Sequence, residues 1–259
     1  MGCDQVNSCS TANGGILVVQ NLVKTYPGAR VSAVNGLTIS INEGEVFGLL
    51  GPNGAGKTTA ISIMNTLMRP TGGTVTICGI DAVRHPSEVK GFIGYVPQEI
   101  ALYPTMSVRE NLRFIGRIYG LKGKDLEARI DECIDFVGLE GGADQRVHTY
   151  SGGMKRRANL AAGILHRPKI LFLDEPTVGI DPQSRNLILE RLAAMKGGTA
   201  MIYTTHYMGE VEQICSRVAI MDTGHIIAEG TLKDLCDYVP GSTNMEEVFI
   251  GLTGKQLRD

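Results

Sequence analysis

The chain has 259 residues, a formal net charge of −2, no tryptophan and 5% aromatic residues, and its mean hydropathy is +0.03. A chain of this length with 43% hydrophobic residues can bury a large core without disulfide or metal staples. The balanced charge excludes a broad positive surface, and few aromatic rings are available to stack on bases. Nucleic acid is therefore not expected as a partner.

The N-terminal segment and the cysteines point to a cytosolic protein. Residues 1–15 are small and polar, which predicts a flexible tail, and no basic region precedes an apolar core as in a secretory signal. The six cysteines form no C-x-x-C pair, so we expect reduced thiols and not a zinc ribbon. No run of about 18 apolar residues occurs, so we expect no membrane span.

Short apolar or alternating runs predict a mixed set of strands. Residues 16–19, 31–34, 37–41 and 74–78 are expected in an antiparallel layer. More continuously apolar runs are typical of parallel strands buried on both faces. They lie at residues 46–50, 92–96, 170–173, 200–204 and 218–221.

A glycine-rich loop follows the run 46–50 and matches the pattern G-x-x-x-x-G-K-[ST]. The glycines let successive N–H groups face phosphate oxygens, and the next helix adds the positive end of its dipole. Lys57 is expected to reach the β- and γ-phosphates, and the Thr58 hydroxyl to bind Mg²⁺. The nucleotide-binding residues of this loop are Gly51, Pro52, Asn53, Gly54, Ala55, Gly56, Lys57, Thr58 and Thr59.

The segment 98–166 has helical periodicity. Ser107 and Glu110 form a capping box, and the first helix is expected to bury Val108, Leu112, Ile115 and Ile118. Ser151 is a second N-cap, followed by Gly152 and Gly153, which are costly inside a helix unless an anion approaches their N–H groups. The basic residues 155–157 are expected to form a solvated helix face.

The apolar run 170–173 ends in two carboxylates. Asp174 is expected beside the glycine-rich loop, where it would hold Mg²⁺. Side chains alternate along a strand, so Glu175 is expected to point away from Asp174. In that position Glu175 can orient and deprotonate a water molecule that attacks the γ-phosphate.

Together these motifs resemble the nucleotide-binding subunit of ABC (ATP-binding cassette) transporters over residues 16–235. The resemblance implies that Gln98 senses Mg²⁺ and the attacking water, and that His206 contacts the γ-phosphate. It also implies that Tyr26 stacks on adenine and that the loop with Asp181 crosses a dimer interface. In this family Ser151, Gly152 and Gly153 would close over ATP held by a second copy. Tyr150 and Met154 depart from the commonest signature, which has Leu and Gln at these positions.

The resemblance also implies an α/β fold: a P-loop RecA-like core with an antiparallel β subdomain and an inserted α-helical subdomain. The expected divisions are a tail (1–15), the β layer with the first part of the core (16–97), the helical subdomain (98–166), the second part of the core (167–238) and a C-terminal helical tail (239–259).

The functional prediction is a Mg-dependent ATPase that dimerises around two Mg-ATP and powers a permease on another chain. Residues 244–254 are similar to the ending of subunits that serve ABC-2-type exporters, which implies export and a position on the cytoplasmic face of the membrane. The alternative is an ABC ATPase that acts mechanically on a non-membrane partner. Such proteins usually carry two cassettes, coiled-coil arms or metal clusters, and this chain shows none of these in its sequence.

Overall fold

The computed structural model describes residues 14–254. The expected N-terminal tail, residues 1–15, therefore lies almost entirely outside the described residues.

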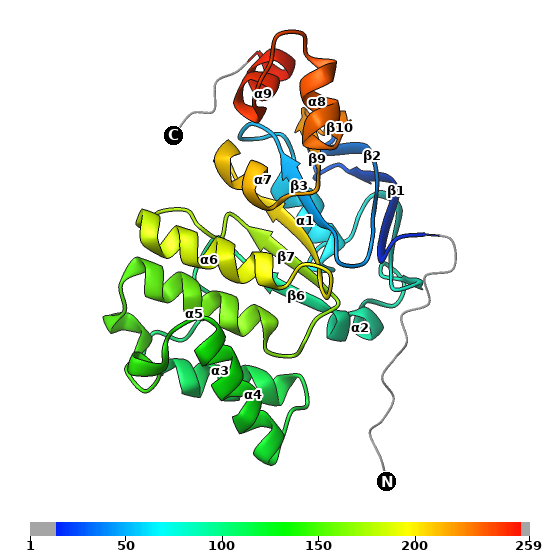
Figure 1. Cartoon of the computed structure of the whole chain (residues 1–259). Helices are drawn as coiled ribbons and strands as arrows, with labels where there is room; N and C mark the ends of the chain where they lie inside the picture. The colour runs from blue at the N-terminus through cyan, green and yellow to red at the C-terminus, as the bar shows by residue number, and fades with distance from the viewer. Residues whose placement is uncertain (1–13, 255–259) are drawn as a thin grey trace.

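The larger sheet contains the parallel strands that the sequence predicts (Figure 1). Within residues 14–254 its strand order is β10-β9-β3-β8-β7-β6. The strands from β9 to β6 run parallel, and β10 pairs antiparallel with β9 at one edge. Every residue of β3, β7 and β8 is buried, as expected for strands covered on both faces. The bounds are Val46–Leu50 (β3), Ile93–Val96 (β6), Ile170–Asp174 (β7), Ala200–Thr204 (β8), Arg217–Asp222 (β9) and His225–Gly230 (β10).

A smaller antiparallel sheet has the order β2-β1-β4-β5 among the described residues. Its strands are Leu17–Lys24 (β1), Val34–Ile41 (β2), Gly72–Ile77 (β4) and Ile80–Asp81 (β5). Their inward side chains share a core cluster with alternate residues of the larger sheet, such as Phe47, Phe172 and Ile202, and with helix α1, Lys57–Met64.

Three helices between β6 and β7 form the lower part of the molecule in Figure 1. They are α3 (Val108–Ile118), α4 (Gly123–Phe136) and α5 (Gly152–Ile164), joined by the 3₁₀ turns η2 (Glu140–Gly142) and η3 (Val147–Thr149). The capping box predicted at Ser107 and Glu110 is present. The buried side of α4 consists of Leu126, Ile130, Cys133 and Ile134, as the helical periodicity predicts.

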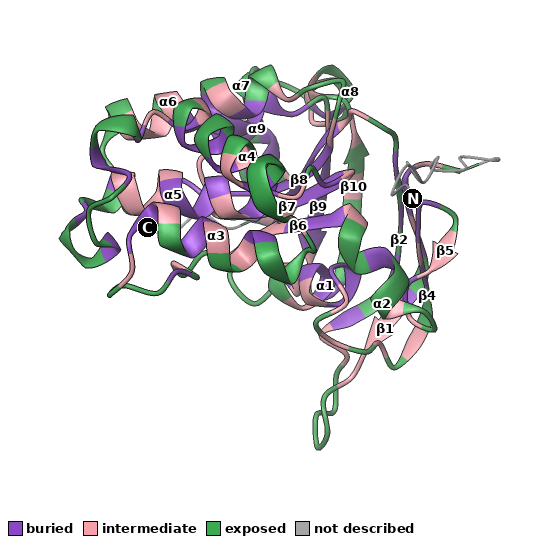
Figure 2. Cartoon of the chain, turned by 90° about the horizontal axis from the view of Figure 1, so that it is seen from below, coloured by how far each residue is buried: buried purple, intermediate pink, exposed green. Residues whose placement is uncertain are grey.

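The remaining helices surround the larger sheet. They are α2 (Pro86–Val89) with the 3₁₀ turn η1 (Lys90–Phe92), α6 (Pro182–Ala194), α7 (Met208–Ile214), α8 (Leu232–Tyr238) and α9 (Met245–Thr253). Figure 2 shows the central strands of this sheet, such as β7 and β8, buried and the outward faces of the helices exposed. A second core cluster contains the alternate strand residues that point to the opposite face of the sheet, such as Leu171 and Tyr203. Buried residues of α5, α6, α7 and α9 belong to this cluster.

The structure corrects three sequence predictions. Residues 31–34 are not a strand: Val31 is 74% exposed and β2 begins only at Val34. Ile118 does not belong to the buried face of α3, because it lies at the last turn and is 67% exposed. Strand β10 was not predicted, because its exposed and half-buried residues alternate at an edge without a strong apolar signal.

The search for membrane spans covered the described residues, and it found no helix there with both the length and the apolar character that a crossing needs.

Candidate active site

The predicted site residues follow four neighbouring strands of the larger sheet. Strands β6, β7, β8 and β3 are adjacent and parallel, so their carboxyl ends meet at one edge. Gln98 follows β6, Asp174 and Glu175 end and follow β7, and His206 follows β8. The glycine-rich loop 51–59, here called the phosphate loop, follows β3.

The phosphate loop leaves the start of α1 open to an anion. Gly56 is the N-cap of α1 and has no side chain to occupy the N–H groups of the first turn, which also contains no acidic residue. Its φ of 103° is a left-handed conformation, and a Cβ there would lie 2.1 Å from the Ala33 carbonyl oxygen, so only glycine fits. Lys57 Nζ donates to the carbonyl oxygens of Gly51 (2.6 Å) and Pro52 (3.1 Å).

Asp174 is a buried carboxylate held by a hydroxyl. Its side chain is at the end of β7, and Thr204 Oγ1 donates to Asp174 Oδ1 over 2.8 Å. Burial raises the pKa of Asp174, the nearby Glu175 charge raises it further, and the Thr204 hydrogen bond and Lys57 oppose these effects. Burial likewise lowers the pKa of Lys57, against the attraction of Glu175 and Asp174. Both charged groups are therefore partly desolvated, and each favours the charged form of the other.

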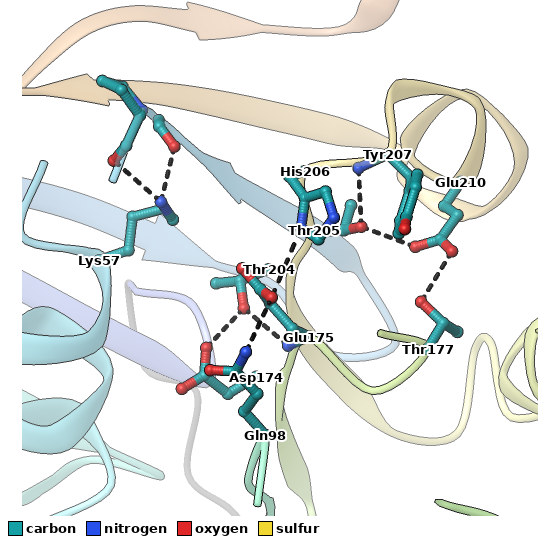
Figure 3. A network of polar contacts seen from close by, with 12 residues as sticks. Lys57, Gln98, Asp174, Glu175, Thr177, Thr204, Thr205, His206, Tyr207 and Glu210 are labelled. Atoms are coloured by element: carbon teal, nitrogen blue, oxygen red, sulfur yellow. Dashed lines mark hydrogen bonds and ion pairs between the residues drawn. The ribbon is translucent and has the colours of Figure 1, made fainter. Parts of the chain in front are cut away.

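Glu175 connects the loops after β6 and β8. Gln98 Nε2 donates to Glu175 Oε2 over 3.2 Å, and His206 Nδ1 lies 3.4 Å from the same oxygen (Figure 3). Glu175 has a φ of 47°, which is left-handed and strained for a residue with a Cβ. The alternation of side chains along β7 therefore ends at Asp174, so the direction of the Glu175 side chain does not follow from it.

Tyr26 lies beside the helix that follows the phosphate loop. Its hydroxyl is 3.1 Å from Thr59 Oγ1, and Lys24 Nζ is 5.6 Å from its ring centre. The residue as a whole is 40% exposed.

The signature residues Ser151, Gly152 and Gly153 have other neighbours in the same chain. Ser151 caps α5 by accepting from the Met154 N–H, as predicted. A Cβ on Gly153 would lie 2.1 Å from Ser184 Oγ, so this glycine also permits the close packing of α5 on the start of α6. Asp181 is the N-cap of α6, and its hydrogen bonds with the N–H and hydroxyl of Ser184 lower its pKa.

The predicted solvated face at residues 155–157 is wrong, because these side chains are half-buried and two of them bind carbonyl groups. Arg156 donates to the carbonyl oxygen of Gln98, and Arg157 donates to those of Val137 and Gly138 at the end of α4. The arginines therefore fix the loop after β6 and the end of α4 to the signature helix.

The oxygen donors of the site fit a magnesium ion. Thr58, Gln98 and Asp174 offer a hydroxyl, an amide oxygen and a carboxylate, the hard ligands that Mg²⁺ shares with phosphates and water. Asp174 Oδ1 accepts from Thr204, which orients the carboxylate. These residues would hold the ion together with nucleotide phosphates.

Sequence reasoning missed a buried polar cluster behind the site. Its centre is the carboxylate of Glu210 on α7, which accepts from the hydroxyls of Thr177, Tyr203 and Thr205. A glutamate in a helix next to Gly209 gives no sequence signal of burial. The one available hint is that Thr205 adjoins His206.

Comparisons with known proteins agree with these observations. A family model described as ABC transporter matches residues 34–178. The linearmycin resistance ATP-binding protein of Bacillus subtilis is 45% identical over 238 residues, which cover 92% of this chain and 76% of that protein. A Nod factor export ATP-binding protein of Cupriavidus pinatubonensis is 42% identical over 223 residues, 86% of this chain and 68% of that protein.

Solved structures give the same result. An ATP-binding subunit of an ABC transporter superposes with a TM-score of 0.83 and 28% identity, over 92% of this chain and 99% of that one. A dimeric ATP-binding cassette in a post-hydrolysis state with ADP and Pi has a TM-score of 0.77 and 25% identity, over 83% and 98% of the two chains. The predicted fold class is therefore confirmed.

Replacing Asp174 by Asn should stabilise the chain in the absence of nucleotide. A carboxylate whose pKa is raised in the folded state destabilises folding once the pH exceeds the unfolded value of about 4, and the full effect is reached above the raised value. Asn keeps the acceptor for Thr204 and carries no charge. Urea unfolding should show a larger gain in free energy of unfolding at pH 7.5 than at about pH 3, where the Asp174 carboxyl is protonated in both the folded and the unfolded chain.

The matched control is Asp181→Asn, because hydrogen bonds lower the pKa of Asp181 and its charge favours the folded state. This variant should show no gain in the free energy of unfolding. A loss of stability in Asp174→Asn at pH 7.5 would show that the buried charge is not a cost to the fold.

Proposed function

This chain belongs to the ABC transporter family and is an ATPase of that family, and we propose that two copies close around two Mg-ATP to power a separate membrane permease. The convergence of Gln98, Glu175 and His206 beside the phosphate loop carries this proposal.

Glu175 is proposed as the general base. Gln98 donates to one of its oxygens at 3.2 Å, and His206 Nδ1 lies 3.4 Å from the same oxygen. A carboxylate in hydrogen-bond reach of an attacking water can accept its proton, which typically accelerates a reaction by about 10²–10⁴-fold. His206 and Gln98 orient the water and the γ-phosphate in this proposal.

Binding of the nucleotide is assigned to the phosphate loop and Tyr26. The open first turn of α1 and Lys57 would hold the phosphates, and the ring of the exposed Tyr26 would stack on adenine. Thr58, Gln98 and Asp174 would hold Mg²⁺, which neutralises charge on the β- and γ-phosphate oxygens when bound.

A second copy is proposed to complete each site. Ser151 and Gly152 are exposed, and the groups nearest to Gly152 and Gly153 belong to the loop before α6 and to its first turn, residues 179–184. These exposed residues at the start of α5 would face the phosphates bound by the partner copy, with Asp181 at the interface. A dimeric cassette with ADP and Pi among the structural relatives supports this arrangement.

The proposed permease contact is an apolar patch near the end of α3, made of Tyr103, Phe114 and Ile118. Their exposed fractions are 55%, 43% and 67%. Tyr103 packs edge-on against Phe114, with ring centres 5.4 Å apart, and Ile118 is one helical turn from Phe114. Exposed apolar side chains in contact with one another mark an interaction surface. We propose that a cytoplasmic helix of the permease packs on this patch.

Export is the proposed direction of transport, with the chain on the cytoplasmic face of the cell membrane. Relatives named for linearmycin resistance and Nod factor export support this proposal. So does α9, whose sequence is similar to the ending of subunits that serve ABC-2-type exporters.

Glu175→Gln should abolish turnover and trap a dimer. Glutamine keeps the shape but accepts no proton, so we expect the rate of ATP hydrolysis to fall by about 10²–10⁴-fold while ATP binding survives. Loss of the charge also reduces repulsion of the phosphates, so size-exclusion chromatography in saturating Mg-ATP should show a dimer.

The control is Glu190→Gln, which removes an exposed carboxylate on α6 and should hydrolyse ATP as the wild type does. Wild-type turnover in Glu175→Gln would remove Glu175 as the base, and a monomer at saturating Mg-ATP would argue against the shared site.

Phe114→Asp should release the membrane partner without affecting the isolated ATPase. A charge at the centre of an apolar contact typically costs more than 1.4 kcal/mol, so the yield of co-purified permease should fall about tenfold or more. The measurement is affinity isolation from a detergent extract of the native membranes, with a photo-crosslinker at position 118 to identify the contact.

Tyr238→Asp is the control, because it introduces the same charge at another exposed aromatic residue. Retention of an integral membrane protein by Phe114→Asp would place the docking surface elsewhere. Crosslinking to a ribosomal or other non-membrane protein would favour the alternative of a mechanical ATPase.

A further inference from the structure

We infer that Glu210 is a positioning residue that holds His206 against the proposed base, Glu175. This inference rests on the proposed function and assigns the buried cluster behind the site. The polar partners of the Glu210 side chain are Thr177, Tyr203, Thr205 and Arg185, so it acts on His206 through the residues on either side of it.

Glu210 is a carboxylate inside the protein. Its side chain is only 3% exposed. Thr177 Oγ1 donates to Oε1 at 2.7 Å, whereas Tyr203 OH and Thr205 Oγ1 donate to Oε2 at 2.8 and 2.7 Å. Arg185 Nε lies 3.3 Å from Oε1. Burial of a charge is costly unless it is paired and hydrogen-bonded, and here both oxygens are satisfied.

The donors come from the segments that carry the site, as Figure 3 shows for Thr177 and Thr205. Thr177 is two residues after Glu175, Tyr203 lies on β8, and Thr205 immediately precedes His206. Arg185 belongs to α6, just after the loop with Asp181. One carboxylate therefore connects the loop after β7, the loop after β8 and the start of α6.

Thr205 transmits this restraint to His206. Its hydroxyl donates to Glu210 and accepts from the Tyr207 N–H at 3.0 Å, so the backbone is fixed on both sides of His206. The Tyr207 ring packs against both His206 and Arg185. Its centre lies 4.2 Å from the centre of the His206 ring and 4.2 Å from the Arg185 guanidinium carbon.

The contact between His206 and Glu175, which this support holds in place, is weak by itself. His206 Nδ1 and Glu175 Oε2 are 3.4 Å apart, and the two side chains are 26% and 18% exposed. A contact at this distance and exposure does not define the imidazole position, whereas the hydrogen bonds behind it are short and buried. We therefore assign the geometry of His206 to Glu210 and its hydroxyl donors.

The test is a double-variant cycle on steady-state ATP hydrolysis by the full chain. Glu210→Gln removes the charge but keeps the size, and it should lower kcat by about 10–100-fold, the range found for residues that orient a reactive group. The KM for ATP should change less than about twofold, because the phosphate loop is untouched. In a His206→Ala background, the same change should lower kcat by less than about threefold.

Glu212→Gln is the matched control, since it removes an exposed carboxylate from the same helix and should leave kcat unchanged. If Glu210→Gln does not fold, Thr205→Val replaces it in the cycle, because this variant leaves three donors on Glu210. If Glu210→Gln lowers kcat by the same factor in the wild-type and the His206→Ala backgrounds, the positioning role is overturned. Full kcat in a folded Glu210 or Thr205 variant would overturn it as well.

The same data separate this inference from the proposed function. A wild-type chain without ATP turnover contradicts the proposed function and, with it, the role of Glu210. Full activity in His206→Ala contradicts the role of His206 and therefore its positioning. Turnover that requires His206 but is independent of Glu210 overturns the inference alone.

Discussion

The site depends on one constraint: strands β6, β7, β8 and β3 are parallel neighbours, so their carboxyl ends lie side by side. Residues 77 positions apart, Gln98 and Glu175, come within hydrogen-bond distance through this arrangement. The strands are held in place by burial on both faces, because alternate residues enter two separate core clusters. Each loop at this edge therefore begins from a rigid position and can carry chemistry.

This edge concentrates features that do not favour stability. Asp174 is a buried carboxylate with a raised pKa, Glu175 has a left-handed backbone, and Glu210 is a charge in the interior. Such departures from local preference cluster at functional sites, where surrounding structure compensates for them. Here the hydroxyls of Thr204, Thr177 and Thr205 provide much of that compensation.

Much of the fold could be predicted because its signals are local. The apolar runs gave five parallel strands, the capping box gave the start of α3, and the glycine pattern gave the phosphate loop. Signals that depend on tertiary packing were missed. Nothing local shows that Ile118 is exposed or that Arg156 and Arg157 bind carbonyl groups of distant loops.

The candidate site divides in the same way. Lys57, Asp174, Glu175 and His206 stand in motifs with recognisable spacing, so the sequence could nominate them. Glu210 could not be nominated, because a glutamate in a helix is ordinarily solvated and its donors lie on β8, α6 and the loop after β7. Gly153 was expected to serve an anion, and its packing against Ser184 could not be foreseen without the position of α6.

The central claim is that each catalytic site is assembled from two chains, and mixing two inactive variants tests it most directly. Lys57→Ala removes a phosphate contact but keeps the signature, whereas Ser151→Arg blocks the signature but keeps the phosphate loop. A mixed dimer contains one site in which both parts are intact. We expect ATP hydrolysis, absent in either variant alone, to return on mixing in proportion to the mixed dimer. Activity that stays absent on mixing, or persists in Ser151→Arg alone, would contradict a shared site.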